Sequence, residues 1–195
     1  MNRFESMENL IKSILNCTVC MDHLPMGPNP VLSVSKSAKI VIIGQAPGLK
    51  VHNSGIPWDD LSGRRLRDWM NLDKDQFYDS KNIAIIPMGF CYPGKGKSGD
   101  LPPRKECAPL WHQQLFDTLE TVELILLVGK YAQDYYLPKV KKKKLTETVS
   151  NFEQYLPEFF PLPHPSPRNI AWFKRNAWFE KQVIPRLQLR VQEVL

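Results

Sequence analysis

The chain has 195 residues, of which 43% are hydrophobic, so it can bury a core as one large domain or two small ones. It contains no run of about eighteen apolar residues, which argues against a membrane span, and its first residues lack the apolar segment of a secretory signal. A net charge of +6 permits a polyanionic partner without requiring one. We therefore expect a cytoplasmic protein with no membrane partner.

The elements are predicted from hydrophobic periodicity, from apolar runs and from glycine or proline at their ends. Ser62 is a candidate N-cap for the second helix, and Pro185 marks a kink or a start in the last one. In chain order, we predict a helix over 6–15, a strand over 39–44, a helix over 61–72, a strand over 82–86, a helix over 108–121, a strand over 123–128, a helix over 130–137, a weaker strand over 158–162 and a final helix.

Short apolar runs that alternate with helices are typical of a parallel sheet whose two faces are both covered. The sequence therefore predicts an α/β fold, a three-layer αβα sandwich around a mostly parallel, four-stranded sheet. We treat residues 1–195 as a single domain. Ligands of such sheets bind outside the carboxyl ends of the strands, and the motifs below lie there.

The first motif, IVIIGQAPG, ends the first predicted strand at Gly44 and turns the chain at Pro47-Gly48. Glycines at this place let backbone amides approach a ligand closely, although an ordinary tight turn has the same composition. The second motif, GIPWDDLSGRRL, carries Trp58, which can stack on a flat ligand or fill the core. Asp59 and Asp60 can cap the following helix, the commoner role, or activate a water.

The four cysteines are Cys17 and Cys20, which form a C-x-x-C pair, and Cys91 and Cys107, which enclose a glycine- and proline-rich loop. In a reducing compartment such thiols are metal ligands, catalytic groups or buried apolar residues rather than disulfides. Four thiolates suit a [4Fe–4S] cluster or zinc.

The segment PLPHPSPRN, residues 161–169, places His164 among three prolines. Proline fixes φ and has no amide proton, so this segment is a stiff loop rather than a helix. Because it follows the fourth predicted strand, His164 should lie at the same sheet edge as the GQAPG loop. A histidine there can stabilise a developing anion, or it can be structural.

The basic residues gather in two clusters, Lys139 with Lys141 to Lys144, and Arg64 with Arg65 and Arg67. Each cluster can be a solvated surface, a mobile loop or a contact for a polyanion. The sequence leaves these alternatives open.

Taken together and in this order, the four motifs resemble the uracil-DNA glycosylase superfamily, and most closely its iron–sulphur branch from bacteria and archaea. The resemblance runs from Cys17 to about Trp178. It implies a monofunctional enzyme that extrudes a uracil-like or otherwise damaged base from DNA and hydrolyses its N-glycosidic bond in base-excision repair. It also implies a [4Fe–4S] cluster on Cys17, Cys20, Cys91 and Cys107, with zinc as the lesser alternative, and no organic cofactor. We expect a monomer.

The resemblance also assigns roles to residues of this chain. It implies that His164 stabilises the departing base anion, that Trp58 stacks on the extruded base, and that Ser166 holds phosphate. The residues that it implies for catalysis are His164, Gln45 and Asp59. Those implied to contact the base are Gly44, Ala46, Pro47, Gly48, Trp58, Pro87 and Met88. Those implied to contact the DNA backbone are Ser166, Arg168, Lys95 and Lys97. Arg168 stands where some members place an apolar wedge, and it can fill the same gap or bind phosphate.

Three positions depart from the pattern of the family. Gln45 stands where the iron–sulphur branch usually has glutamate, Ala46 where the better-known enzyme has the aspartate that positions water, and Pro87 where an asparagine usually reads the uracil edge. Asp59 or Asp60 can replace the water-positioning group, whereas Met88 and Gly89 can read a base only through their backbone. These departures leave two hypotheses: a glycosylase with a different or looser specificity than uracil alone, and a non-catalytic nucleic-acid-binding protein on the same fold.

Overall fold

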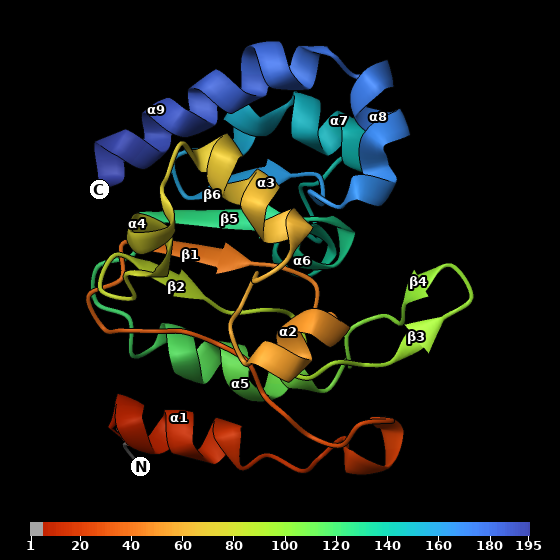
Figure 1. Ribbon diagram of the computed structural model, residues 1–195. Helices are drawn as coiled ribbons and strands as arrows, with labels where there is room; N and C mark the ends of the chain where they lie inside the picture. Colours follow the sequence, from red (N-terminus) through yellow and green to blue (C-terminus); the bar gives the residue numbers. More distant parts are fainter. Residues whose placement is uncertain (1–5) are drawn as a thin grey trace.

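Four short apolar strands form the centre of the protein, for which the computed structural model describes residues 6–195 (Figure 1). All four run parallel, in the order β2-β1-β5-β6. The bounds are β1 Ile40–Ile43, β2 Ile83–Ile85, β5 Leu124–Val128 and β6 Phe159–Leu162. Each lies within its predicted range, so the predicted α/β fold with a four-stranded parallel sheet is confirmed. Residues 1–5 of the expected domain lie outside the described part.

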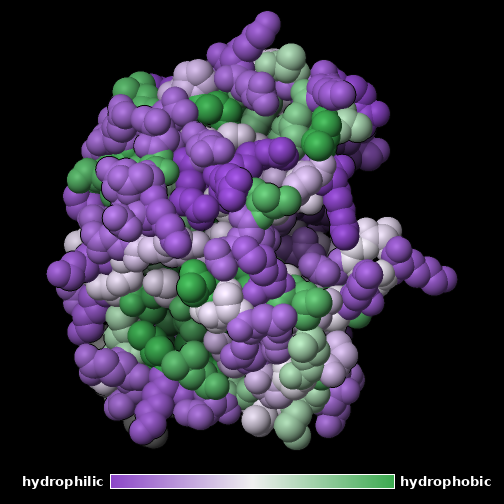
Figure 2. All heavy atoms as spheres, in the orientation of Figure 1, coloured by the Kyte–Doolittle hydropathy of each residue, from purple (hydrophilic) through white to green (hydrophobic). Residues whose placement is uncertain are grey.

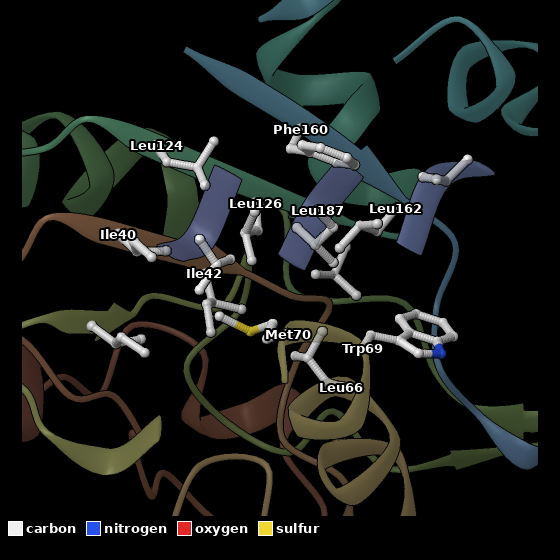
Figure 3. Close-up of a cluster of buried hydrophobic side chains, with 14 of the residues drawn as sticks. Ile40, Ile42, Leu66, Trp69, Met70, Leu124, Leu126, Phe160, Leu162 and Leu187 are labelled. Atoms are coloured by element: carbon white, nitrogen blue, oxygen red, sulfur yellow. The ribbon is translucent and has the colours of Figure 1, made fainter. Parts of the chain in front are cut away.

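Successive side chains of the strands enter two different cores, as the alternation of a strand requires. Ile40 and Ile42 of β1 belong to one core, whereas Val41 and Ile43 belong to the other. Figure 3 shows side chains of the first core converging, among them Ile42 of β1, Leu126 of β5 and Phe160 of β6. Because both faces are buried, the strands are almost purely apolar, which is why short apolar runs predicted them.

Helices cover both faces of the sheet and complete the three layers (Figure 1). The first core is covered by α3 (Leu61–Met70), α4 (Lys74–Tyr78), α7 (Leu145–Ser150) and α9 (Ile184–Val194), and the second by α1 (Met7–Leu15), α5 (Cys107–Phe116) and α6 (Lys130–Tyr136). The remaining elements are α2 (Leu49–Ser54), α8 (Ile170–Arg175), the hairpin of β3 (Lys95–Gly96) and β4 (Gly99–Asp100), a π-helical turn (Phe179–Val183) and the 3₁₀ turns Met21–His23, Phe152–Tyr155 and Pro167–Asn169.

Two expectations about helix ends are corrected, and a third, the start of the last helix at Pro185, is confirmed. The prediction of Ser62 as N-cap is wrong, because Asp60 caps α3 by accepting a hydrogen bond from the amide of Gly63 at 2.8 Å. The helix predicted over 108–121 ends at Phe116, since the chain then turns and the amide of Glu120 donates to the carbonyl of Lys36. Pro185 lies in the first turn of α9, where its missing amide proton costs no hydrogen bond.

Several of the elements that the sequence did not predict, such as α2, α8 and the β3–β4 hairpin, lie near the end of the sheet toward which the strands point (Figure 1). The β3–β4 hairpin projects from the body there, and Figure 2 shows the surface hollowed beside it. Over residues 6–195, no helix is long and apolar enough to cross a membrane.

The central strand β5 generates a stability prediction. Leu126 has no exposed surface, and replacing it by alanine should destabilise the fold by about 2–5 kcal/mol, because the cavity cannot fully collapse. Leu189 of α9 is 44% exposed and provides the matched leucine-to-alanine control, with an expected change within about 0.5 kcal/mol. Urea denaturation of both variants measures the difference, and equal losses would contradict this description of the core.

Candidate active site

A cleft of about 490 Å³ opens at the carboxyl end of the sheet, where the loops after β1, β2 and β6 meet. It is the place at which a parallel sheet binds its ligands. The predicted site residues that line it are Gly44, Gln45, Ala46, Pro47, Gly48, Trp58, Pro87, His164, Ser166 and Arg168. Residues far apart in the sequence therefore share one cavity.

His164 is held by hydrogen bonds on both its ring and its backbone. Its Nδ1 accepts from the amide of Ser166 at 3.2 Å, and its carbonyl accepts from the side chain of Asn169 at 2.8 Å. Arg65 of α3 donates to the carbonyl of Pro165 at 3.1 Å while lying over the ring of Phe173. Together with the prolines, these contacts fix the loop that carries the histidine.

The protonation state of His164 follows from this surrounding. Burial lowers the pKa of the imidazole below its ordinary value of 6.5, although the nearby carboxylate of Asp60 acts in the opposite direction. A neutral ring that accepts at Nδ1 carries its proton on Nε2. The site therefore holds a neutral imidazole with one remaining N–H donor at neutral pH.

Trp58 lies half-buried between the cleft and the first core. Its backbone has a φ of 57°, in the left-handed region. A Cβ at Gly63 would lie 1.7 Å from the carbonyl oxygen of Trp58, and a Cβ at Gly44 would lie 2.7 Å from its ring. Two glycines thus admit the indole, whose ring centroid is 5.7 Å from that of His164. The side chain packs on the core, which is one of the two roles that the sequence left open, and it also lines the cleft.

The two neighbouring aspartates are placed differently. Asp60 lines the cleft, and its Oδ1 is engaged by the amide of Gly63. Asp59 lines a separate cavity and lies 3.7 Å from the ammonium of Lys50. The structure therefore brings Asp60, rather than the predicted Asp59, to the cleft that holds His164.

The wall formed by the loop after β2 has no free backbone donor. Pro87 lacks an amide proton, and its carbonyl accepts from Nε2 of the buried His112 at 3.1 Å. The amide of Met88 donates to the carbonyl of Gly44 at 2.9 Å, and the amide of Gly89 to that of Gln45 at 3.0 Å. Met88 itself is buried outside the cleft. This loop can limit the shape of a bound ligand, but its backbone cannot donate a hydrogen bond to it.

His112 fixes this wall from inside the second core. Its Nδ1 lies 2.6 Å from the hydroxyl of Tyr136, and burial lowers its pKa to about 4. The ring is consequently neutral and works as a fixed partner for Pro87. No sequence motif singled out His112, since a histidine within a helical apolar pattern is most often structural.

The hairpin forms the opposite rim of the cleft. The guanidinium of Arg168 donates to the carbonyl of Ser98 at 3.2 Å, and Gln45 donates to the carbonyl of Leu101 at 3.4 Å. Lys95 and Lys97 are exposed on the same hairpin and do not line the cleft. Arg168 thus connects the histidine loop to the hairpin.

Ser166 lines the cleft and accepts a hydrogen bond at its hydroxyl from the amide of Arg168. The polar lining residues that had no assigned role in the sequence include Asp100, Tyr131 and Asn169. Tyr131 lies three residues after the end of β5, behind Gly129 and Lys130, and this position was the one available signal for it.

The four cysteines gather away from the cleft and form no disulfide. Cys20 and Cys91 share a small buried cluster. Burial raises the pKa of Cys107 to about 12, and the thiols of Cys20, Cys91 and Cys17 contribute in the same direction. The four thiols therefore bring together the segment before β1, the loop after β2 and the start of α5.

This donor set fits a thiolate-bound metal group by its chemistry and its common location. As the side chains stand, however, residues 6–195 contain no group of three or more histidine, cysteine, aspartate or glutamate side chains arranged to hold a metal ion.

Comparison with known proteins gives a family. The fold is similar to that of a solution structure from Methanosarcina acetivorans whose own assignment as a uracil DNA glycosylase is provisional, with 16% identity, a TM-score of 0.44, and coverage of 80% of this chain and 93% of that one. The sequence model of the uracil DNA glycosylase superfamily matches residues 33–188, which include the GQAPG loop, Trp58 and His164. Since this match spans most of the chain, the protein belongs to the uracil DNA glycosylase superfamily.

Proposed function

We propose that the protein is a monofunctional DNA glycosylase that hydrolyses the N-glycosidic bond of a damaged base turned out of DNA. The observation that carries this proposal is the neutral His164, held by Ser166 in the same cleft as Trp58 and the GQAPG loop. A base inside a duplex is not accessible to such a cleft, so the nucleotide must leave the stack.

The chemistry follows from the groups that line the cleft. Trp58 offers a flat surface for the extruded base. As the bond between the base nitrogen and C1′ of the sugar breaks, the electron pair leaves with the base, and a donor from Nε2 of His164 stabilises the resulting anion. The sugar becomes an oxocarbenium-like cation that a water attacks at C1′.

We assign the orientation of this water to Asp60. Its Oδ1 is occupied by the cap of α3, which leaves Oδ2 to accept a proton from the water as the C–O bond forms. Ala46 has no polar side chain for this purpose, and Asp59 lies outside the cleft.

In this proposal, the enzyme accepts a wider range of bases than an enzyme that is specific for uracil alone. A pocket that hydrogen-bonds the edge of a substrate rejects analogues far more strongly than a pocket that only fits its shape. Because Pro87 replaces an edge-reading side chain and the amides of Met88 and Gly89 are engaged, discrimination depends on fit and on how well the base leaves as an anion. The same features support a second candidate, a DNA-binding protein without catalysis.

We further propose that the four cysteines hold a [4Fe–4S] cluster, as in the iron–sulphur branch, with zinc as the alternative. Such a cluster would have a structural role, joining the N-terminal segment to the loop after β2 and to α5. No catalytic step involves it.

The role of His164 predicts the effect of its replacement. His164→Ala should lower the rate of base release by about 10²–10³, since one donor to the developing anion is lost. His164→Gln keeps an amide donor and should retain part of the rate. The assay is alkali-sensitive strand breakage of uracil-containing and other damaged oligonucleotides, single- and double-stranded. An active wild type and an unchanged His164→Ala would contradict the assignment, whereas folded protein that binds DNA but releases no base would favour the second candidate.

The lowered pKa of His164 predicts a pH dependence. Folding lowers the pKa, so the neutral ring is retained through neutral pH, and protonation occurs only on the acid side of the ordinary value of 6.5. Protonation removes the acceptor for the amide of Ser166. The rate of base release should therefore not change between about pH 6.5 and 8 on account of His164. A loss of activity with rising pH in this range, absent from His164→Gln, would show that the protonated ring is the active form.

The metal proposal predicts the result of removing one thiol. Cys17→Ala should lose iron and solubility together, because the remaining three thiolates cannot complete the cluster. Val19→Ala, at an exposed position between the two cysteines of the C-x-x-C pair, should keep the iron content of the wild type. Elemental analysis and visible absorption of the purified proteins measure this. Full iron in Cys17→Ala would refute the ligand assignment, and zinc in the wild type would select the alternative metal.

A further inference from the structure

A strongly basic turn, residues 139–144, joins α6 to α7 and is here called the lysine turn. Five of its six residues are lysines. Neither the fold nor the cleft explains this composition. Lys139, Lys143 and Lys144 are exposed.

The lysine turn is anchored, although its sequence is equally typical of a mobile loop. The carbonyl of Val140 accepts from the hydroxyl of Tyr155 at 3.2 Å, and the amide of Lys142 donates to the hydroxyl of Thr148 at 3.1 Å. The ammonium of Lys141 pairs with Asp134 of α6. The remaining lysines are therefore presented from a fixed backbone.

Most of these charges are not neutralised by the protein. Within residues 6–195, Lys139, Lys142 and Lys143 have no carboxylate at ion-pair distance, and Lys144 has only an exposed contact of 3.9 Å with Glu147. Clustering like charges without partners costs free energy through repulsion. Such a cluster is complementary to a polyanion, which would relieve that repulsion.

The lysine turn lies beside the proposed active site. Leu145, which directly follows it, lines a cavity of about 250 Å³ together with Gln45 and His164. Thr146 accepts a hydrogen bond from the indole of Trp172 at 2.9 Å, which ties α7 to α8. Figure 1 shows α6, α7 and α8 at the end of the sheet toward which the strands point. The turn is therefore continuous with one wall of the site.

We propose that the lysine turn is a DNA-backbone contact that holds the strand where it leaves the active-site cleft. This inference rests on the proposed function in taking DNA as the partner. The turn binds phosphates without reading sequence, since lysine ammonium groups contact phosphate oxygens and carry no base information. Binding releases counterions, so its contribution depends on salt.

The test compares two triple variants of equal charge. The first triple, Lys139→Gln, Lys143→Gln and Lys144→Gln, changes the lysine turn. The control triple, Lys36→Gln, Lys74→Gln and Lys81→Gln, changes three exposed lysines near the other end of the sheet, of which Lys36 and Lys81 precede β1 and β2 and Lys74 begins α4. Each triple removes three charges from the net +6, so a difference between them reports position rather than total charge. The probes are undamaged single-stranded oligonucleotides, one long enough to reach past the cleft and one that spans only the cleft.

We expect the slope of log K for binding against log salt to become less negative by about 2 in the lysine-turn variant with the long oligonucleotide, since each phosphate contact contributes about 0.7. Binding of the short oligonucleotide should not change. The control variant should behave as the wild type. Equal binding by the two triples overturns the inference, as does an equal loss for the short probe. Because undamaged DNA is used, a protein that releases no base but shows the expected difference supports this contact while the proposed catalysis fails. Normal base release together with equal binding by the two triples supports the proposed catalysis and overturns this contact.

Discussion

The parallel pairing of β1 with both β2 and β5 is the constraint on which the rest of the structure depends. Parallel strands end at the same edge of a sheet, so the loops after β1, β2 and β6 have to meet there. Their backbones and side chains line one cleft although 120 residues separate Gly44 from His164. A parallel sheet is stable here because helices bury both of its faces. This burial is favourable because the strands are short apolar runs.

The second determinant is the rigidity of the histidine loop. Prolines limit its backbone, Arg65 binds its carbonyls from α3, and Ser166 fixes the imidazole from within the loop. In the proposed reaction, a donor that is already oriented needs no reorganisation when charge develops on the leaving base. Burial then keeps this donor neutral, so the same packing that positions the ring also determines its protonation state.

The wall opposite the histidine shows how one residue limits what a site can recognise. Pro87 has neither an amide proton nor a polar side chain, and His112 occupies its carbonyl. The adjacent amides hold the β1 loop instead of a ligand. The wall is therefore well fixed but unable to donate a hydrogen bond, which favours recognition by shape over recognition by base edge. In the proposed function, the lysine turn complements this wall by binding the DNA backbone.

The sequence by itself determined the elements and their order. The strands at 39–44, 82–86, 123–128 and 158–162 could be predicted because burial on both faces requires apolar residues at every position of a short strand. The motifs that form the cleft were also visible, since glycine, proline and a lone histidine at strand ends have local physical meanings. Short elements such as α2, α4 and the hairpin were not, because two to six residues carry too little periodicity.

Only the tertiary structure decided which of two adjacent aspartates enters the cleft, since Asp60 caps α3 and Asp59 turns toward Lys50. It also decided that Trp58 lies between two glycines, that His112 holds Pro87, and that the lysine turn is anchored beside His164. Each of these is either a contact between segments distant in sequence or a choice between two neighbouring residues of similar chemistry. The local sequence favours neither arrangement in such cases, and the packing of the whole chain determines which one forms.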